Sequence, residues 1–423
     1  MNFPNMVRIK QKIYSEVVND IPETVCAELR SINIKDKIKK GDTIAITVGS
    51  RGVSNIDVIV KAIVDNLKEI GASPFIIPAM GSHGGATSEG QKQVLAHYGV
   101  TEELMGAPVK STMDVVEIGE TPDGIKVMID KNAYEADHIL VVNRVKVHTD
   151  FKGEIESGLM KMMTIGLGKH KGAETYHQAA IEYGMEHMIT NVGRTVLKNV
   201  PVLCGLGIVE NGFDETAVIR AFRPQELESG EKDLLNLGKK YFPKLPFDNI
   251  DILILDVIGK NISGTGMDTN IVGRFYVPLY SKEPEKPKIK RILVSDLTPE
   301  SDGNAVGIGI ADFCNQRIVD KIDRNVTYIN CLTGMAPEKA RIPIYYSCDK
   351  QILETALKTI GLVEPENAKV IHAYSTLHME YLEISQSLAE EVSQRKDIEI
   401  LGKPHSFIFD NNGNFVPVVY KRD

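Results

Sequence analysis

Two kinds of hydrophobic spacing alternate along the first half of the chain. Between residues 48 and 74, apolar side chains recur every three or four positions and predict a helix around Ile56, Ile63 and Leu67. A second helical pattern covers residues 176–196. Continuous apolar runs, which predict buried β-strands, lie at residues 43–48, 74–79, 138–142 and 202–209.

The second half repeats this alternation. Strands are predicted at residues 252–255, 291–294, 326–330 and 369–372, and helices at 305–320 and 351–360. The tail, residues 406–419, predicts a hairpin that turns at Asn411-Asn412-Gly413. A polar segment at residues 230–248 contains Pro243 and Pro246 and predicts a domain junction.

Strands that alternate with helices are typical of parallel sheets covered by helices. The pattern therefore predicts two α/β domains with mainly parallel sheets and an active-site cleft between them. The expected boundaries are 1–245 for an N-terminal cofactor-binding domain and 246–384 for a C-terminal domain. Residues from about 385 to 423 are a candidate segment to pack back on the first domain. Ligands of such folds bind at the carboxyl ends of strands.

Composition narrows the function classes. Lys and Arg total 49 against 57 for Asp and Glu, and this net charge of −8 offers no basic field for nucleic acid or a membrane surface. The strongest apolar run, residues 250–258, is about half the ~20 residues of a membrane-spanning helix. Five cysteines without a CxxC pair argue against a disulfide framework or a zinc ribbon. With no apolar signal core near the start, we expect a cytoplasmic protein.

Polar residues follow the predicted strands of the first domain. The turn at 49–52 carries Ser50 and Arg51, which together suit a carboxylate or phosphate. The turn at 80–89 is rich in glycine and carries His83, a side chain that titrates near neutrality. The alternative for each is an ordinary surface turn.

Three further residues are candidates because their side chains can titrate or carry a positive charge. His148 lies just past the strand at 138–142, and Lys161 lies within an apolar stretch that would favour its neutral, nucleophilic amine. Lys260 follows a strand of the second domain. The alternatives are lysines whose charged ends reach solvent. Together these residues suit a small anionic substrate, acid–base catalysis and a cofactor held covalently or by a metal.

The order and separation of these motifs resemble the lactate racemase family of nickel-pincer nucleotide isomerases. The resemblance is carried by motifs between about residues 40 and 180, and beyond them it extends only to the architecture. The matching segments are the Ser50-Arg51 turn, Gly81-Ser82-His83-Gly84, Val147-His148-Thr149, and Lys161 followed by His177.

The resemblance implies a role for each residue. Lys161 would bond covalently to the cofactor, a pyridinium thioamide/thiocarboxylate mononucleotide, and His177 would complete its nickel site. His83 and His148 would be the paired acid and base, and Arg51 would hold the substrate.

Further roles also follow from the resemblance. Ser50, Gly81 and Ser82 would belong to the cofactor site. Lys260 would contact the substrate carboxylate from the second domain. The expected partners are a small anionic hydroxy acid and separate proteins that make the cofactor, so protein from an ordinary host could lack it. Association into a homo-oligomer is left open.

The sequence departs from the family pattern near these motifs. Val48 stands where the family has aspartate, and Gly52 where it has proline. Lys161 follows Gly158-Leu159-Met160 rather than Gly-Gly-Arg, and the segment between His148 and Lys161 is longer. These differences leave the substrate open.

The predicted function is a nickel-dependent isomerase that racemises or epimerises a 2-hydroxy acid by reversible hydride transfer. Hydride transfer avoids the dianion that proton abstraction beside a carboxylate would create. Two alternatives stay open. One is a nicotinamide-dependent oxidoreductase, against which no GxGxxG follows the first strand. The other is a non-catalytic ligand- or cofactor-binding protein of the same fold.

Overall fold

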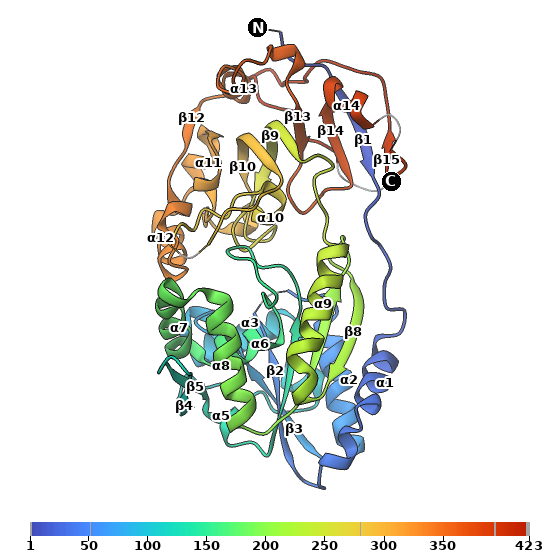
Figure 1. Ribbon diagram of the computed structural model, residues 1–423, viewed down its shortest axis with the longest axis vertical. Coiled ribbons are helices and arrows are strands. Elements are labelled where there is room, and N and C mark those ends of the chain that lie inside the picture. Colours follow the sequence, from blue (N-terminus) through green and yellow to red (C-terminus); the bar gives the residue numbers. More distant parts are fainter. Residues whose placement is uncertain (1, 51, 280, 393–394, 420–423) are drawn as a thin grey trace. The chain divides into compact units, whose positions relative to one another are not determined.

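The computed structural model describes residues 2–50, 52–279, 281–392 and 395–419 (Figure 1). The chain divides into two compact units. We call residues 14–242 the first unit, and residues 1–13 together with 243–423 the second unit. Each unit is an α/β structure whose sheet is mostly parallel, which confirms the predicted fold class.

The first unit is built on a five-stranded sheet in the order β3-β2-β6-β7-β8. The first four strands in this order run parallel to one another, and β8 runs antiparallel to β7. The predicted strands of the first half are all present here. The strands are β2 (Thr43–Val48), β3 (Ser73–Pro78), β6 (His138–Arg144), β7 (Val202–Glu210) and β8 (Thr216–Phe222).

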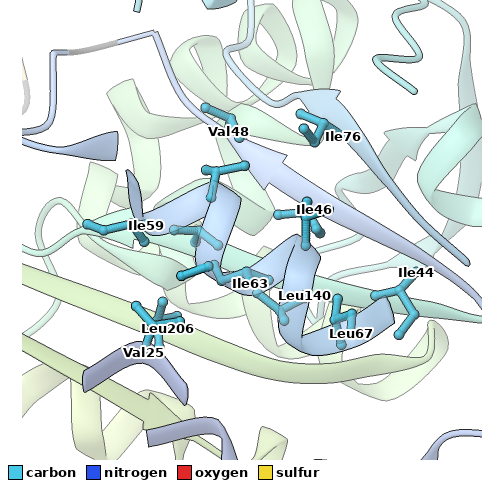
Figure 2. Packing of buried hydrophobic residues seen from close by; sticks show 14 of the residues in the cluster. Val25, Ile44, Ile46, Val48, Ile59, Ile63, Leu67, Ile76, Leu140 and Leu206 are labelled. Atoms are coloured by element: carbon cyan, nitrogen blue, oxygen red, sulfur yellow. The ribbon is translucent and has the colours of Figure 1, made fainter. Parts of the chain in front are cut away.

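Aliphatic packing on one face of this sheet stabilises the first unit. Ile59, Ile63 and Leu67 share one face of α2 (Ile56–Glu69) because they are four residues apart, and all three are fully buried. Figure 2 shows them packed against strand residues such as Ile46 and Leu140. Each side chain of this kind contributes about 1.5–3 kcal/mol on burial. Helix α1 (Ile21–Ser31) adds to the same cluster.

Other helices complete the first unit. The helical pattern at 176–196 forms two helices rather than one, because Gly184 has φ +83° and separates them. A small hairpin, β4 (Val115–Glu120) with β5 (Lys126–Asp130), lies outside the main sheet. The remaining helices are α3 (Ser88–His97), α4 (Glu102–Met105), α5 (Lys131–Tyr134), α6 (Leu159–Lys161), α7 (Lys169–Tyr183), α8 (Met185–Asn199) and α9 (Leu227–Tyr241).

The second unit is built on an eight-stranded sheet in the order β12-β11-β10-β9-β13-β14-β1-β15. Strands from β12 to β13 are parallel, and the last three are antiparallel. The strands are β1 (Met6–Gln11), β9 (Asn249–Ile258), β10 (Lys288–Leu297), β11 (Phe313–Asn315), β12 (Ile344–Tyr346), β13 (Val370–Ala373), β14 (Tyr381–Ser385) and β15 (Ile398–Ile400).

The pairing of β1 with β14 and β15 places both ends of the described chain in the second unit. The sequence pattern instead predicts residues 1–13 in the first domain and residues 385–423 as a candidate segment to pack back on it. Hydrogen bonds between distant strands decide this division, and they leave no local signal. The junction itself, at residues 242 and 243, lies within the predicted segment 230–248.

The described residues of the second unit include the α-helices α10 (Thr269–Val272), α11 (Gln316–Lys321), α12 (Arg324–Thr333), α13 (Asp349–Leu357) and α14 (Gln386–Val392). The strand predicted at 326–330 is wrong, because the Asp323 side chain accepts hydrogen bonds from the amides of Asn325 and Val326 and starts α12.

The helix predicted at 305–320 is also wrong over residues 305–315. These residues contain a short 3-10 turn (Ile308–Ile310) and β11, and α11 begins only at Gln316. A bridge between Phe409 and Phe415 confirms the predicted reversal of the tail. No helix in the described part of the chain combines the length and the apolarity needed to cross a membrane.

Candidate functional site

The carboxyl ends of three parallel strands collect the predicted residues of the first unit. Val48 and Pro78, the last residues of β2 and β3, are register partners, so the turns that follow them start side by side. Ser50 lies in the first turn and His83 in the second. The parallel strand β6 leads to His148.

His83 is held by its neighbours from two turns. Its Nδ1 is hydrogen-bonded to the Ser50 hydroxyl, and the Tyr98 hydroxyl donates to the Ser50 carbonyl over 3.1 Å. Gln91 Nε2 donates to the carbonyls of Gly81, at 2.9 Å, and His83, at 3.1 Å. The His83 side chain itself is exposed. The imidazole is thus oriented while its Nε2 edge faces away from Ser50.

Gly81 and Ser82 form the bend of this turn. Gly81 has φ +58°, and a Cβ there would lie 3.2 Å from both the side chain and the carbonyl of Ile165, so glycine is required. The Gly81 amide donates to the Gly166 carbonyl over 3.3 Å. The turn therefore packs against the π-helical segment Met162–Gly166, which directly follows Lys161.

Lys161 and His148 form a close pair. Lys161 Nζ lies 2.6 Å from His148 Nε2, and the Asp150 amide donates to His148 Nδ1 over 3.1 Å. The His148 amide donates to the buried Glu156 carboxylate over 2.7 Å. Because Nδ1 accepts a hydrogen bond, the neutral ring carries its proton on Nε2. That proton is donated to Lys161, whose nitrogen is then the neutral, nucleophilic amine.

His177 lies on α7 and has a defined tautomer. Its Nδ1 donates to the Ala173 carbonyl over 2.7 Å, so the lone pair of the neutral ring is on Nε2. Burial lowers the pKa of His177 and so favours its neutral form. A neutral imidazole whose second nitrogen donates to a carbonyl is the usual form of a histidine metal ligand.

The chemistry of these side chains fits the group that the family implies. Lys161 would offer an amine for a covalent bond, and His177 would offer a lone pair to a metal. In the described residues, no three His, Cys, Asp or Glu side chains form a metal site of their own. A nickel ion held here would need most of its ligands from a bound cofactor.

Two predicted residues are not part of this cluster as described. Arg51 lies outside the described residues. Lys260 belongs to the second unit, where its Nζ donates to the Gly264 carbonyl at 2.7 Å and to Asn330 Oδ1 at 2.9 Å. Its role as a substrate contact stays a prediction.

Sequence reasoning missed Glu231, a fully buried residue of α9. Its Oε2 accepts from the amide of Met160, the residue before Lys161, over 2.7 Å. Its Oε1 has no hydrogen-bond partner among the described residues. Burial raises the pKa of Glu231 from 4.5 to about 7. Its place between Leu227 and Leu234 on the apolar face of α9 was the available signal.

We expect the Glu231→Gln variant to gain stability relative to the natural protein as pH rises. A carboxyl whose pKa is raised by folding destabilises the folded state increasingly between pH 4.5 and about 7. Between pH 5 and pH 8 the difference in unfolding free energy should change by about 2 kcal/mol. Denaturant unfolding at both pH values measures it. Asp233→Asn, at an exposed position of α9, is the control, and a constant difference between Glu231→Gln and the natural protein would contradict the prediction.

Comparison with known proteins agrees with the resemblance in the sequence. Residues 5–188 match the family model described as the lactate racemase N-terminal domain. The lactate racemase apoprotein from Thermoanaerobacterium thermosaccharolyticum has a similar fold, with a TM-score of 0.50 and 14% identity over 93% of this chain and 97% of that one. A protein from Thermotoga maritima gives a TM-score of 0.49 and 14% identity over 67% of this chain and 72% of its own. No curated protein matches the sequence.

Proposed function

We propose that this chain, whose residues 5–188 match the model of the lactate racemase N-terminal domain, is an isomerase of that family that racemises or epimerises a 2-hydroxy acid with a nickel-pincer nucleotide on Lys161. The observation that supports the proposal is the pair of Lys161 Nζ and His148 Nε2, 2.6 Å apart, because the ring tautomer in which Nε2 donates would make the lysine a neutral amine. A charged ammonium could not form the covalent bond.

When bound, the cofactor would supply an electrophilic ring that accepts hydride from the substrate carbon. The chain's own task is to move the hydroxyl proton. Acylation of the Lys161 nitrogen would delocalise its lone pair, and it would then no longer accept the proton on His148 Nε2. His148 would be released to serve the substrate hydroxyl.

His83 would serve the opposite face of the substrate. The Ser50 hydroxyl both donates and accepts hydrogen bonds. It can therefore stay bonded to His83 Nδ1 whether that nitrogen carries a proton or not. His83 Nε2 could then take up a proton and return it without losing its support. Two such groups are what inversion of a carbon centre requires, because hydride leaves one face and returns to the other.

The substrate would be a small 2-hydroxy acid or sugar acid. We propose Arg51 and Lys260 as the cations that bind its carboxylate. Because Val48 and Gly52 replace the family's aspartate and proline near Arg51, we propose the reaction class without assigning lactate. Separate proteins would make the cofactor, and a cytoplasmic location suits their supply.

Co-production with a cofactor-assembly pathway tests the proposal. We expect the intact mass to show one covalent adduct, with near-equimolar nickel by elemental analysis. His177→Ala should keep the organic adduct and lose the nickel, because Nε2 of His177 would be the one protein ligand. His170→Ala, on the exposed side of the same helix, should keep both.

The other outcomes identify the alternatives. If a known racemase loads in parallel and this chain gains neither adduct nor nickel, the function is that of a ligand- or cofactor-binding protein of the same fold. Oxidation of hydroxy acids with added nicotinamide nucleotide, in the absence of any adduct, would identify an oxidoreductase.

A further inference from the structure

Lys169 is a fully buried lysine that the proposed reaction does not use. Its Nζ lies 3.4 Å from the carboxylate of Asp130, which is also fully buried. The ammonium group donates to the Pro78 carbonyl over 2.8 Å and to Gln91 Oε1. Burial lowers the pKa of Lys169 and raises that of Asp130.

Burying this ion pair costs free energy, which a purely structural packing role would not explain. Removing two charged groups from water is unfavourable, and apolar residues of similar volume often replace a buried pair without loss. Lys169 also has φ +55°, a left-handed conformation that residues with a Cβ rarely adopt. The bonding partners of the ammonium group indicate what it does instead.

One set of contacts fixes the turn that carries His83. Lys169 binds the Pro78 carbonyl at the end of β3, where this turn begins. Through Gln91, a fully buried side chain, it also holds the carbonyls of Gly81 and His83 itself. The start of the turn is therefore bound to the ammonium group directly, and the part that carries His83 is bound to it through Gln91.

A second set of contacts fixes the segment that joins Lys161 to His177. Lys169 is the first residue of α7, and His177 follows it about 12 Å along the same helix. The Asp130 amide donates to the Leu167 carbonyl over 2.7 Å, just before this helix begins.

We propose that Lys169, with Gln91 and Asp130, is a positioning network that sets the distance between His83 and the helix carrying His177. The inference rests on the proposed function, in which one histidine moves a proton and the other holds the metal. Lys169 does not touch the reacting atoms and acts only through these residues. A shift of about 1 Å between such groups costs on the order of 100-fold in rate.

The first test uses the protein without cofactor, so that its result does not depend on the proposed reaction. Histidine ring signals are followed by NMR in Lys169→Met, in Gln91→Met and in the natural protein. We expect the His83 and His177 signals to shift in Lys169→Met, and the His83 signal in Gln91→Met. The signal of exposed His170 should stay. Lys171→Met, an exposed lysine of the same helix, is the matched control.

The second test uses loaded enzyme. We expect Lys169→Met to lower kcat about 100-fold with little change in KM. Combining Lys169→Met with Asp130→Asn, which neutralises the stranded carboxyl, should recover thermal stability and leave kcat low. Unchanged His83 signals in Gln91→Met and in folded Lys169→Met would overturn the inference, and so would recovery of kcat together with stability. Gln91→Met keeps the buried pair, so it still gives an answer if Lys169→Met does not fold.

Discussion

Alanine at His83 or at His148 is expected to lower kcat for hydroxy-acid interconversion by about 10²–10⁴-fold, the usual contribution of a positioned acid or base. Each histidine would serve one face of the planar keto acid. Loss of either histidine therefore leaves one face without a group that transfers the proton. Both directions of the reaction should slow together, because the reverse reaction uses the same two groups.

The measurement requires correction for loading. His148 also contacts Lys161, so the His148→Ala variant is expected to carry less cofactor, and rates are divided by the adduct found in the intact mass. His97→Ala, at an exposed position of α3, is the control for a histidine outside the site. Unchanged turnover in both single variants would rule out a mechanism with two histidine bases.

Lys161→Ala is expected to abolish the covalent adduct completely and to leave the protein folded. The side chain is only partly buried, so its loss should cost about 1 kcal/mol or less of stability. Lys161→Arg should fail equally, since a guanidinium stays charged and is not a nucleophile. The measurement is intact mass with a melting curve for each variant.

Peptide mapping locates the adduct in the natural protein. Three lysines lie close together in the sequence, Lys161, Lys169 and Lys171. Lys169 is fully enclosed, and Lys171 is exposed on α7. An adduct found on either of these two would disprove the assignment to Lys161.

The sequence predicts β2, β3, β6 and β7 well because most residues of these strands are buried on both faces. A continuous apolar run such as 43–48 then has one favourable state, and its turn carries the polar residues. Prediction fails where burial is partial. In α12, the side chains of Val326 and Ile329 are 41% and 67% exposed, so these β-branched residues do not indicate a buried strand. The N-cap at Asp323 favours a helix instead.

The site, too, is predicted only in part. The candidate catalytic and cofactor-binding residues follow the ends of strands, which the sequence pattern indicates, and the resemblance to the family groups these residues into one site. The supporting residues Glu231 and Lys169 are charged, and a charged residue in a sequence is usually solvated. Only tertiary packing encloses them, so no local pattern distinguishes them from surface residues.

The pairing of β1 with β14 and β15 has a consequence for synthesis on the ribosome. Residues 14–242 form an uninterrupted stretch, and all strands of its sheet have been made once that stretch emerges. Strand β1 is made before the first unit, yet its partners come from residues 381–385 and 398–400. At about 5–20 residues per second, β1 waits on the order of ten seconds after the first unit is complete. Met6, Val7 and Ile9 are buried in the folded unit, and during that time the strands that pair with β1 do not yet exist to cover them.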